Sequence, residues 1–210
     1  CAIMLLITLI LYGCDTSKPP DDAGPMAKVT QTDGHTFYID RFEFPNQPGT
    51  IPTAEMDLST AKSSCASVGK RLCTPEEWKS ACGQSKFPYG EQYEHNRCHS
   101  NQQNSDGHTS LMHGRTKQVA SGTHRDCHGD AQIYDMVGNL EEWVSDDFKG
   151  MSGNLAGGAW YTYWQYADCT VQYSHEPDYR LAMDRPTDSA GVRCCWSSSP
   201  PSPNNEVVIP

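Results

Sequence analysis

The chain has 210 residues, a formal net charge of −10 at pH 7 and ten cysteines. Its length suits a single domain, since domains commonly span about 100–200 residues. The acidic balance argues against a nucleic-acid partner, because phosphates require a basic face, and against electrostatic attachment to anionic lipid.

The chain begins with an uninterrupted apolar run, AIMLLITLILY, at residues 2–12. This run is shorter than the about 20 residues of a membrane span and is typical of the apolar part of a secretion signal. The next residues complete Leu11-Tyr12-Gly13-Cys14, which resembles a bacterial lipobox. The resemblance implies lipidation of Cys14 and attachment to a membrane by acyl chains. An unmodified secreted protein is the alternative.

These features predict four segments. Residues 1–13 are expected to be a signal peptide that is truncated at its start, and residues 14–26 to hold the lipidated cysteine and a flexible, proline-rich tether. Residues 27–196 are expected to form the domain, and residues 197–210 a disordered tail. The expected location is the bacterial cell envelope, with the lipid-anchored domain facing the periplasm or the outside. Such a compartment is oxidising and suits a chain rich in cysteine.

The first predicted element of the domain is a strand in FYIDRFEF, residues 37–44, which Pro45 ends. A short amphipathic helix is predicted from Ser59, with Gly69 as its C-terminal stop. Residues at helical spacing mark its buried face: Ala61, Cys65 and Val68.

A second short helix has a clearer start. Thr74 can cap it, Pro75 suits the first helical turn, and Glu77 completes a capping box. Trp78 and then Ala81 or Cys82 are expected to face inward.

A long polar loop is predicted for residues 88–131. A loop of that length in a compact domain is either functional or held by cross-links or ions. Cys98-His99 and Cys127-His128 are zinc-type ligands, but thiols oxidise in the expected compartment, so cross-links are favoured over zinc.

Five sequence motifs follow one another along the domain, and together they resemble the formylglycine-generating enzyme family, also called the sulfatase-modifying factor family. They are FYIDRFEFPN (37–46), GKRLCTPEEW (69–78), YDMVGNLEEW (134–143), GGAW (157–160) and GVR (191–193). The resemblance covers nearly the whole domain. It implies an α+β, C-type lectin-like fold with two short helices, small antiparallel sheets and much irregular chain.

Eight cysteines remain for disulfides once Cys1 is removed with the signal and Cys14 is lipidated. They are Cys65, Cys73, Cys82, Cys98, Cys127, Cys169, Cys194 and Cys195. Eight cysteines allow 105 connectivities, so the sequence alone does not define the pairs.

The lectin-like resemblance implies that Cys65, on the first helix, pairs with Cys194 or Cys195 on the last strand. Neighbouring cysteines bridge each other only with strain, so these two are expected to have separate partners, the second being Cys73. The other four cysteines allow three pairings, of which Cys82 with Cys98 and Cys127 with Cys169 is the one guessed.

The family resemblance also implies a calcium site at the turn of YDMVGNLEEW. Asp135 and Glu142 would supply side-chain oxygens, while Gly138 and Leu140 would supply carbonyl oxygens, which are the hard ligands that calcium prefers. The alternative is a turn held by Asn139, with Glu142 merely solvated.

Catalytic members of the family hold copper with two thiolates and oxidise a substrate cysteine to formylglycine. The corresponding positions here are Thr162 and Ala167, and the serine of the family's G-G-S motif is Ala159. Cys169 lacks the second sulfur that Cu(I) requires, and Asp168 beside it disfavours a thiolate. Copper is therefore not expected, and Cys169 is predicted to form a disulfide.

The leading functional hypothesis is a non-catalytic domain that binds a peptide or a carbohydrate through an aromatic groove. Its expected binding residues are Trp160, Tyr161, Tyr163, Trp164 and Tyr166, because aromatic side chains supply large contact areas. If this stretch is a strand, alternation would place about half of them in the core. Two alternatives stay open: a copper-dependent oxidase or related oxidoreductase, and a structural envelope lipoprotein.

Overall fold

The computed structural model describes residues 18–19, 23–100, 117–145, 153–164, 166–172 and 188–198. The predicted signal peptide, the lipidation residue Cys14 and residues 199–210 of the predicted tail lie outside these described residues. In the described part, none of the helices has the length and apolar character needed to cross a membrane.

Two short helices are present, as predicted. Helix α1, Leu58–Ser67, starts at Asp57, whose carboxylate accepts a 2.6 Å hydrogen bond from the backbone N–H of Thr60. The chain leaves α1 through Gly69, whose positive φ of 69° suits glycine.

Helix α2, Pro75–Cys82, begins with the predicted capping box. The Thr74 hydroxyl accepts from the backbone N–H of Glu77 at 3.1 Å, and the Glu77 carboxylate accepts from that of Thr74 at 3.0 Å. Trp78 and Cys82 are buried. The capping residues therefore fix the start of α2 and the side that it buries.

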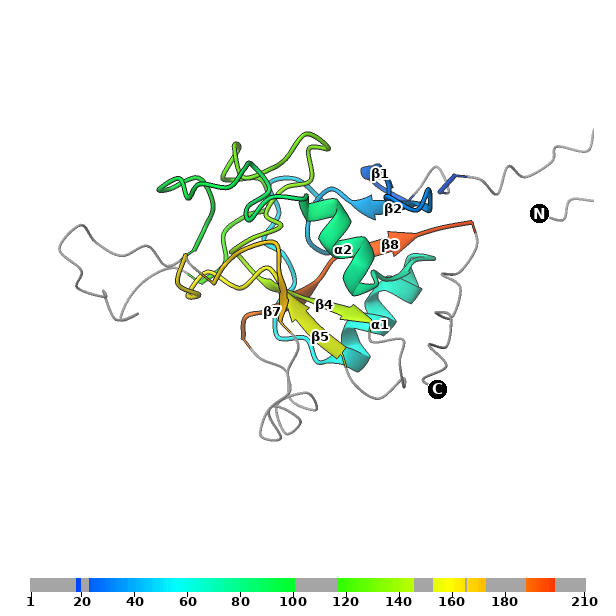
Figure 1. Ribbon diagram of the computed structural model, residues 1–210. Coiled ribbons are helices and arrows are strands. Elements are labelled where there is room, and N and C mark those ends of the chain that lie inside the picture. The colour runs from blue at the N-terminus through cyan, green and yellow to red at the C-terminus, as the bar shows by residue number, and fades with distance from the viewer. Residues whose placement is uncertain are drawn as a thin grey trace, which may run out of the picture.

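One sheet has the strand order β1-β2-β8-β3, and all its neighbours are antiparallel. Figure 1 shows β2 beside β8, with β1 on the other side of β2. The strands are β1 (Met26–Thr30), β2 (Thr36–Asp40), β3 (Arg71–Leu72) and β8 (Cys194–Trp196). Strand β1 is absent from the sequence-based prediction, and it begins one residue before the expected start of the domain.

Strand β2 is shorter than predicted, because the chain turns after Asp40 instead of continuing to Phe44. Asn46 holds this turn: its side chain accepts from the backbone N–H of Phe42 at 3.1 Å and donates to Asp40 at 2.9 Å. Lys70 also binds Asp40, at 2.6 Å. The prediction of a strand that runs to Phe44 is therefore wrong.

The second sheet has the order β6-β5-β4-β7. Its strands are β4 (Glu141–Ser145), β5 (Gly153–Ala156), β6 (Val171–Gln172) and β7 (Ala190–Val192). Strand β4 is antiparallel to β5 but parallel to β7, a pair that the expectation of antiparallel sheets did not include.

The adjacent cysteines of β8 have separate partners. Cys194 bonds to Cys65 on α1, and Cys195 bonds to Cys73 after β3. Successive side chains of a strand point to opposite faces, so one short strand reaches both partners. This part of the predicted connectivity is confirmed.

The other two predicted pairs are wrong: the bonds are Cys82–Cys169 and Cys98–Cys127. The backbone N–H of Cys169 donates to the carbonyl of Lys86 at 2.8 Å, which places it beside the end of α2. The Cys98–Cys127 bond cross-links the long loop, whose described residues contain no helix and no strand longer than an isolated bridge. The prediction that Cys169 forms a disulfide is confirmed.

Candidate functional site

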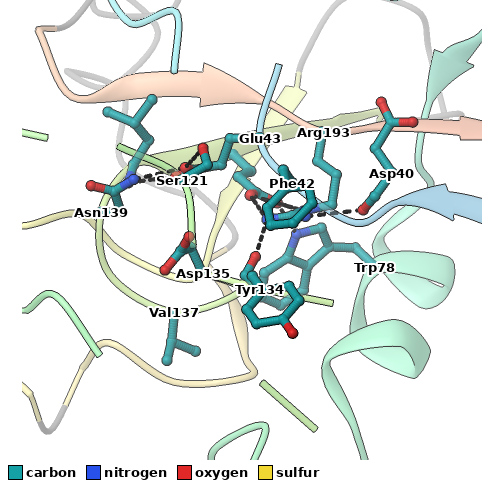
Figure 2. A network of polar contacts seen from close by, with 12 residues as sticks. Asp40, Phe42, Glu43, Trp78, Ser121, Tyr134, Asp135, Val137, Asn139 and Arg193 are labelled. Carbon is teal, nitrogen blue, oxygen red and sulfur yellow. Dashed lines mark hydrogen bonds and ion pairs between the residues drawn. The ribbon is translucent and has the colours of Figure 1, made fainter. Parts of the chain in front are cut away.

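A fully buried ion pair between Arg193 and Glu142 lies where the motifs meet. The Arg193 guanidinium donates to Glu142 at 2.8–3.1 Å and to the carbonyls of Asp40 and Tyr134 at 3.0 and 2.6 Å. Trp78 Nε1 donates to Glu142 at 2.7 Å. Figure 2 shows these side chains converging from different segments. The pair therefore joins four of the five motifs.

A second buried carboxylate, Glu43, ties the turn of YDMVGNLEEW to the loop before it. Glu43 accepts from Asn139 Nδ2 at 2.7 Å, from the Ser121 hydroxyl at 3.1 Å and from the backbone N–H of Leu140 at 3.1 Å. Burial raises the pKa of Glu43 well above its usual range, and the charge of Asp135 adds to this rise. The turn is thus held by Asn139 and Glu43 together (Figure 2).

Asp135 is the third buried carboxylate of this network. One oxygen accepts from the backbone N–H of Gly122 at 2.7 Å, while Oδ1 is buried without a hydrogen-bond partner. Burial raises the pKa of Asp135 to about 6. An unpartnered buried carboxylate oxygen is uncommon and favours a missing positive partner or a proton.

The four expected calcium ligands lie on this turn, but they fit the ion unequally. Asp135 Oδ1 fits, because a cation would satisfy it. Glu142 differs: its two oxygens are engaged by Arg193 and Trp78, so calcium would have to share this carboxylate. The described residues contain no group of three or more His, Cys, Asp or Glu that could hold a metal. A calcium site would therefore depend on Asp135 and on the carbonyls of Gly138 and Leu140.

The aromatic run is defined as residues 160–166. Its described residues, 160–164 and 166, form turns and bends and not the strand that alternation would allow. The backbone N–H of Trp160 donates to the carbonyl of Asn139 at 3.0 Å, which fixes the run to the turn of the carboxylate network. Tyr161 is held by a 3.1 Å hydrogen bond between its hydroxyl and that of Ser189. The predicted alternation of core and surface residues therefore does not apply.

The aromatic run remains partly open to solvent. Trp160, Tyr161, Tyr163 and Trp164 are half-buried, and Tyr166 is 60% exposed. Trp164 stacks on Tyr93 with ring centroids 4.4 Å apart. The five predicted binding residues are neighbours in the chain, and the structure leaves none of them fully buried.

The two positions that hold copper in catalytic relatives do not fit copper here. The Thr162 hydroxyl accepts from the backbone N–H of Ala159 at 2.9 Å, and Ala167 is buried. Every cysteine in the described ranges is in a disulfide. The site therefore has neither the paired thiolates nor a displaced thiol at Cys169.

Sequence reasoning missed the roles of Glu43 and Arg193, although both lie in the motifs. The signal was available in part, since an arginine in a stretch as apolar as AGVRCCW requires a buried acidic partner. The sequence did not show that this partner is Glu142, which had been assigned to calcium.

The model of the family described as "Sulfatase-modifying factor enzyme 1-like domain" matches residues 15–198. The protein "Inactive C-alpha-formylglycine-generating enzyme 2" of Bos taurus is 28% identical over 164 residues, which are 72% of this chain and 52% of the relative. The chain thus spans about half the length of this relative.

The solved structure "Crystal Structure of CarF" matches with a TM-score of 0.53 and 13% identity, over 82% of this chain and 98% of that chain. At that identity the likeness concerns the fold alone, and it agrees with the α+β, C-type lectin-like architecture implied by the motifs. The chain belongs to the family of sulfatase-modifying factor enzyme 1-like domains.

Proposed function

We propose that this chain is a non-catalytic member of its family that binds a ligand through the aromatic run. One observation carries the proposal: Thr162 and Ala167 occupy the copper positions and Cys169 is bonded to Cys82, while the neighbouring aromatic side chains stay accessible. The relative whose name describes it as inactive supports the same view.

The arrangement of the rings favours a peptide over a carbohydrate. A sugar stacks on an open ring face, but Trp164 and Tyr93 use faces against each other, and Trp160 and Tyr161 meet edge to face at 5.2 Å. Ring edges and the spaces between half-buried rings accept apolar side chains of a peptide. Tyr166 is the exposed ring on which a sugar would stack.

Changing Tyr163 and Tyr166 to alanine should weaken binding of a peptide selected from a displayed random library by about tenfold or more. The melting temperature should change little, because neither ring is fully buried. Tyr161 is unsuitable, since its hydroxyl binds Ser189. Titration calorimetry measures the affinity, with Val68→Ala as the control, because Val68 at the C-cap of α1 is exposed and not on the buried face as predicted.

Unchanged affinity in the double variant would remove the aromatic run from the proposal. Selective enrichment of glycans on an array that the double variant loses would favour a carbohydrate in the aromatic run instead. If neither class binds, the structural lipoprotein is the reading that remains.

We also propose that calcium binds Asp135 as a structural ion. Since the pKa of Asp135 is raised to about 6, its ionised form costs stability as the pH rises through 6, and calcium would offset that cost. Calcium at 1 mM, as an order of magnitude, should therefore raise the melting temperature at pH 8 but not at pH 5. Differential scanning fluorimetry against EDTA measures this.

The control for calcium is Asp135→Ala, which should abolish the shift at pH 8, whereas Asp57→Ala at the exposed cap of α1 should keep it. Equal melting temperatures of the unchanged protein with calcium and with EDTA at pH 8 would contradict the ion.

The tether is proposed as well, but it is shorter than the predicted residues 14–26, because buried Ala23 and the Pro25 carbonyl already contact the domain. Residues 14–22 would form a spacer at most about 30 Å long if extended. Four disulfides suit the oxidising side of a membrane. Mass spectrometry of the intact membrane-extracted protein should show acyl chains on Cys14, and Cys14→Ser should release the protein from the membrane fraction. An unmodified Cys14 would contradict the anchor.

A further inference from the structure

A cavity of about 670 Å³ lies between the C-terminal end of α2 and two loops, residues 83–97 and 128–133. Among the described residues of the aromatic run, none lines it. Ligand sites commonly have volumes of about 300–1,000 Å³, so this cavity is large enough for a small molecule and is separate from the site proposed above.

Two disulfides hold the walls of the cavity. The Cys98–Cys127 bond joins the loops directly beside Arg97 and His128, which both line the cavity. Cys82, in the wall formed by α2, is bonded to Cys169. A pre-formed cavity spares a ligand the entropic cost of ordering its walls.

The charge of Arg97 is already compensated. Its Nη1 donates to Glu94 at 2.7 Å, its Nε donates to the carbonyl of Asp126 at 2.8 Å, and its guanidinium lies 4.3 Å from the ring centroid of Tyr89. Asp130, the remaining charged lining residue, is exposed and solvated. A charged ligand would therefore gain little over a neutral one.

Several hydrogen-bonding groups in the lining lack partners among the described residues. They include the side chains of Gln84 and Gln132, which are exposed and would exchange water for a ligand, and one nitrogen of the half-buried His128, whose Nδ1 donates to the Gly129 carbonyl at 2.7 Å. Amides donate and accept, and the free imidazole nitrogen accepts in the neutral ring. A hydroxyl group, which does both, matches this mixture.

The lining contains two phenyl-type rings, of which Phe87 is buried and Tyr89 is covered by its neighbours. Phe87 stacks on one face of Tyr89 with centroids 5.4 Å apart, and Arg97 covers this ring as well. Recognition in this cavity therefore relies on hydrogen bonds more than on stacking or apolar contact, unlike the apolar pockets that bind drug-like molecules.

We propose that this cavity binds a neutral, hydroxyl-rich small molecule of the monosaccharide or disaccharide class, held by Gln84, His128 and Gln132. The proposal does not depend on the aromatic run. Its failure would leave the proposed peptide binding untouched, and the reverse is also true.

The test uses the full chain and saturation-transfer NMR against glucose, galactose, mannose, N-acetylglucosamine and their disaccharides, with glucosamine and glucuronate as charged comparisons. At least one neutral sugar should give saturable binding. Gln84→Ala should weaken it about two- to tenfold, the effect of one lost hydrogen bond, and Ala131→Trp should abolish it by filling the cavity from an exposed lining position.

The matched controls are Gln92→Ala for Gln84→Ala and Gln92→Trp for Ala131→Trp. Gln92 lies on the loop that carries Gln84, is exposed, and is not part of the cavity lining. Both should bind like the unchanged protein. Binding that survives Ala131→Trp, tighter binding of either charged sugar, or no saturation by any neutral sugar would each overturn the proposal.

Discussion

Replacing Arg193 with methionine should lower the free energy of unfolding by about 3–5 kcal/mol, because it leaves the carboxylate of Glu142 buried without its cation. For a chain of this size such a loss corresponds to a fall of about 6–20 °C in melting temperature. The carbonyls of Asp40 and Tyr134 would also lose their donor. Chemical denaturation monitored by tryptophan fluorescence measures the loss.

A second variant separates the unpaired charge from lost packing. Adding Glu142→Gln to Arg193→Met removes the charge and should restore part of the stability. The matched control is Lys117→Met, because Lys117 forms a 3.5 Å ion pair with Asp188 in which both side chains are more than half exposed; it should cost less than about 1 kcal/mol. If Arg193→Met also lowers the free energy of unfolding by less than about 1 kcal/mol, the buried pair does not stabilise the fold.

Elements with local signals could be predicted from the sequence. The start of α2 depends on Thr74, Pro75 and Glu77, which are neighbours in the chain, and the capping box formed as expected. The separate partners of Cys194 and Cys195 could be predicted because neighbouring cysteines bridge each other only with strain, while the partner Cys65 was implied by the lectin-like resemblance. Strand β1 has no comparable signal, since MAKVT is short and its pairing with β2 decides its structure.

Features that depend on distant residues could not be predicted. The aromatic run alternates in a way that a strand would allow, but the contacts of Trp160 with Asn139 and of Cys169 with Lys86 fold it into turns. These contacts join segments far apart in the chain. The pairing of Cys82 with Cys169 has the same origin, because the position of the run decides which cysteine lies beside the end of α2.

The motifs drew attention to the turn of Asp135 to Glu142, and a network of buried carboxylates lies there, but calcium binding at this turn stays a prediction. The absence of paired thiols at Thr162 and Ala167 could be read directly from the sequence. The ion pair of Arg193 with Glu142 and the hydrogen bond from Asn139 to Glu43 form only when strands β4 and β7 and the turn after β2 come together. Neither motif alone shows that Arg193 occupies the Glu142 carboxylate, which was predicted to bind calcium.

Removing the Cys65–Cys194 bond by changing both residues to alanine should cost only about 2–3 kcal/mol, although the bond spans 129 residues. The neighbouring Cys73–Cys195 bond remains in the unfolded chain and leaves a path of about ten residues, so little further entropy is released. Removing Cys98–Cys127 should cost more, about 3–4 kcal/mol, because no shorter path replaces its 29-residue loop.

The test is whether removing Cys98–Cys127 costs more stability than removing Cys65–Cys194. Sequence separation alone, 29 against 129 residues, predicts the opposite order. Loss of both bonds of β8, Cys65–Cys194 and Cys73–Cys195, should cost about 6–7 kcal/mol, which is comparable to the whole stability of many domains. Denaturant titrations of the three variants, with free thiols counted by mass spectrometry, measure this. If removing either bond of β8 alone unfolds the domain as fully as removing both, the bonds act through native packing and not through the unfolded chain.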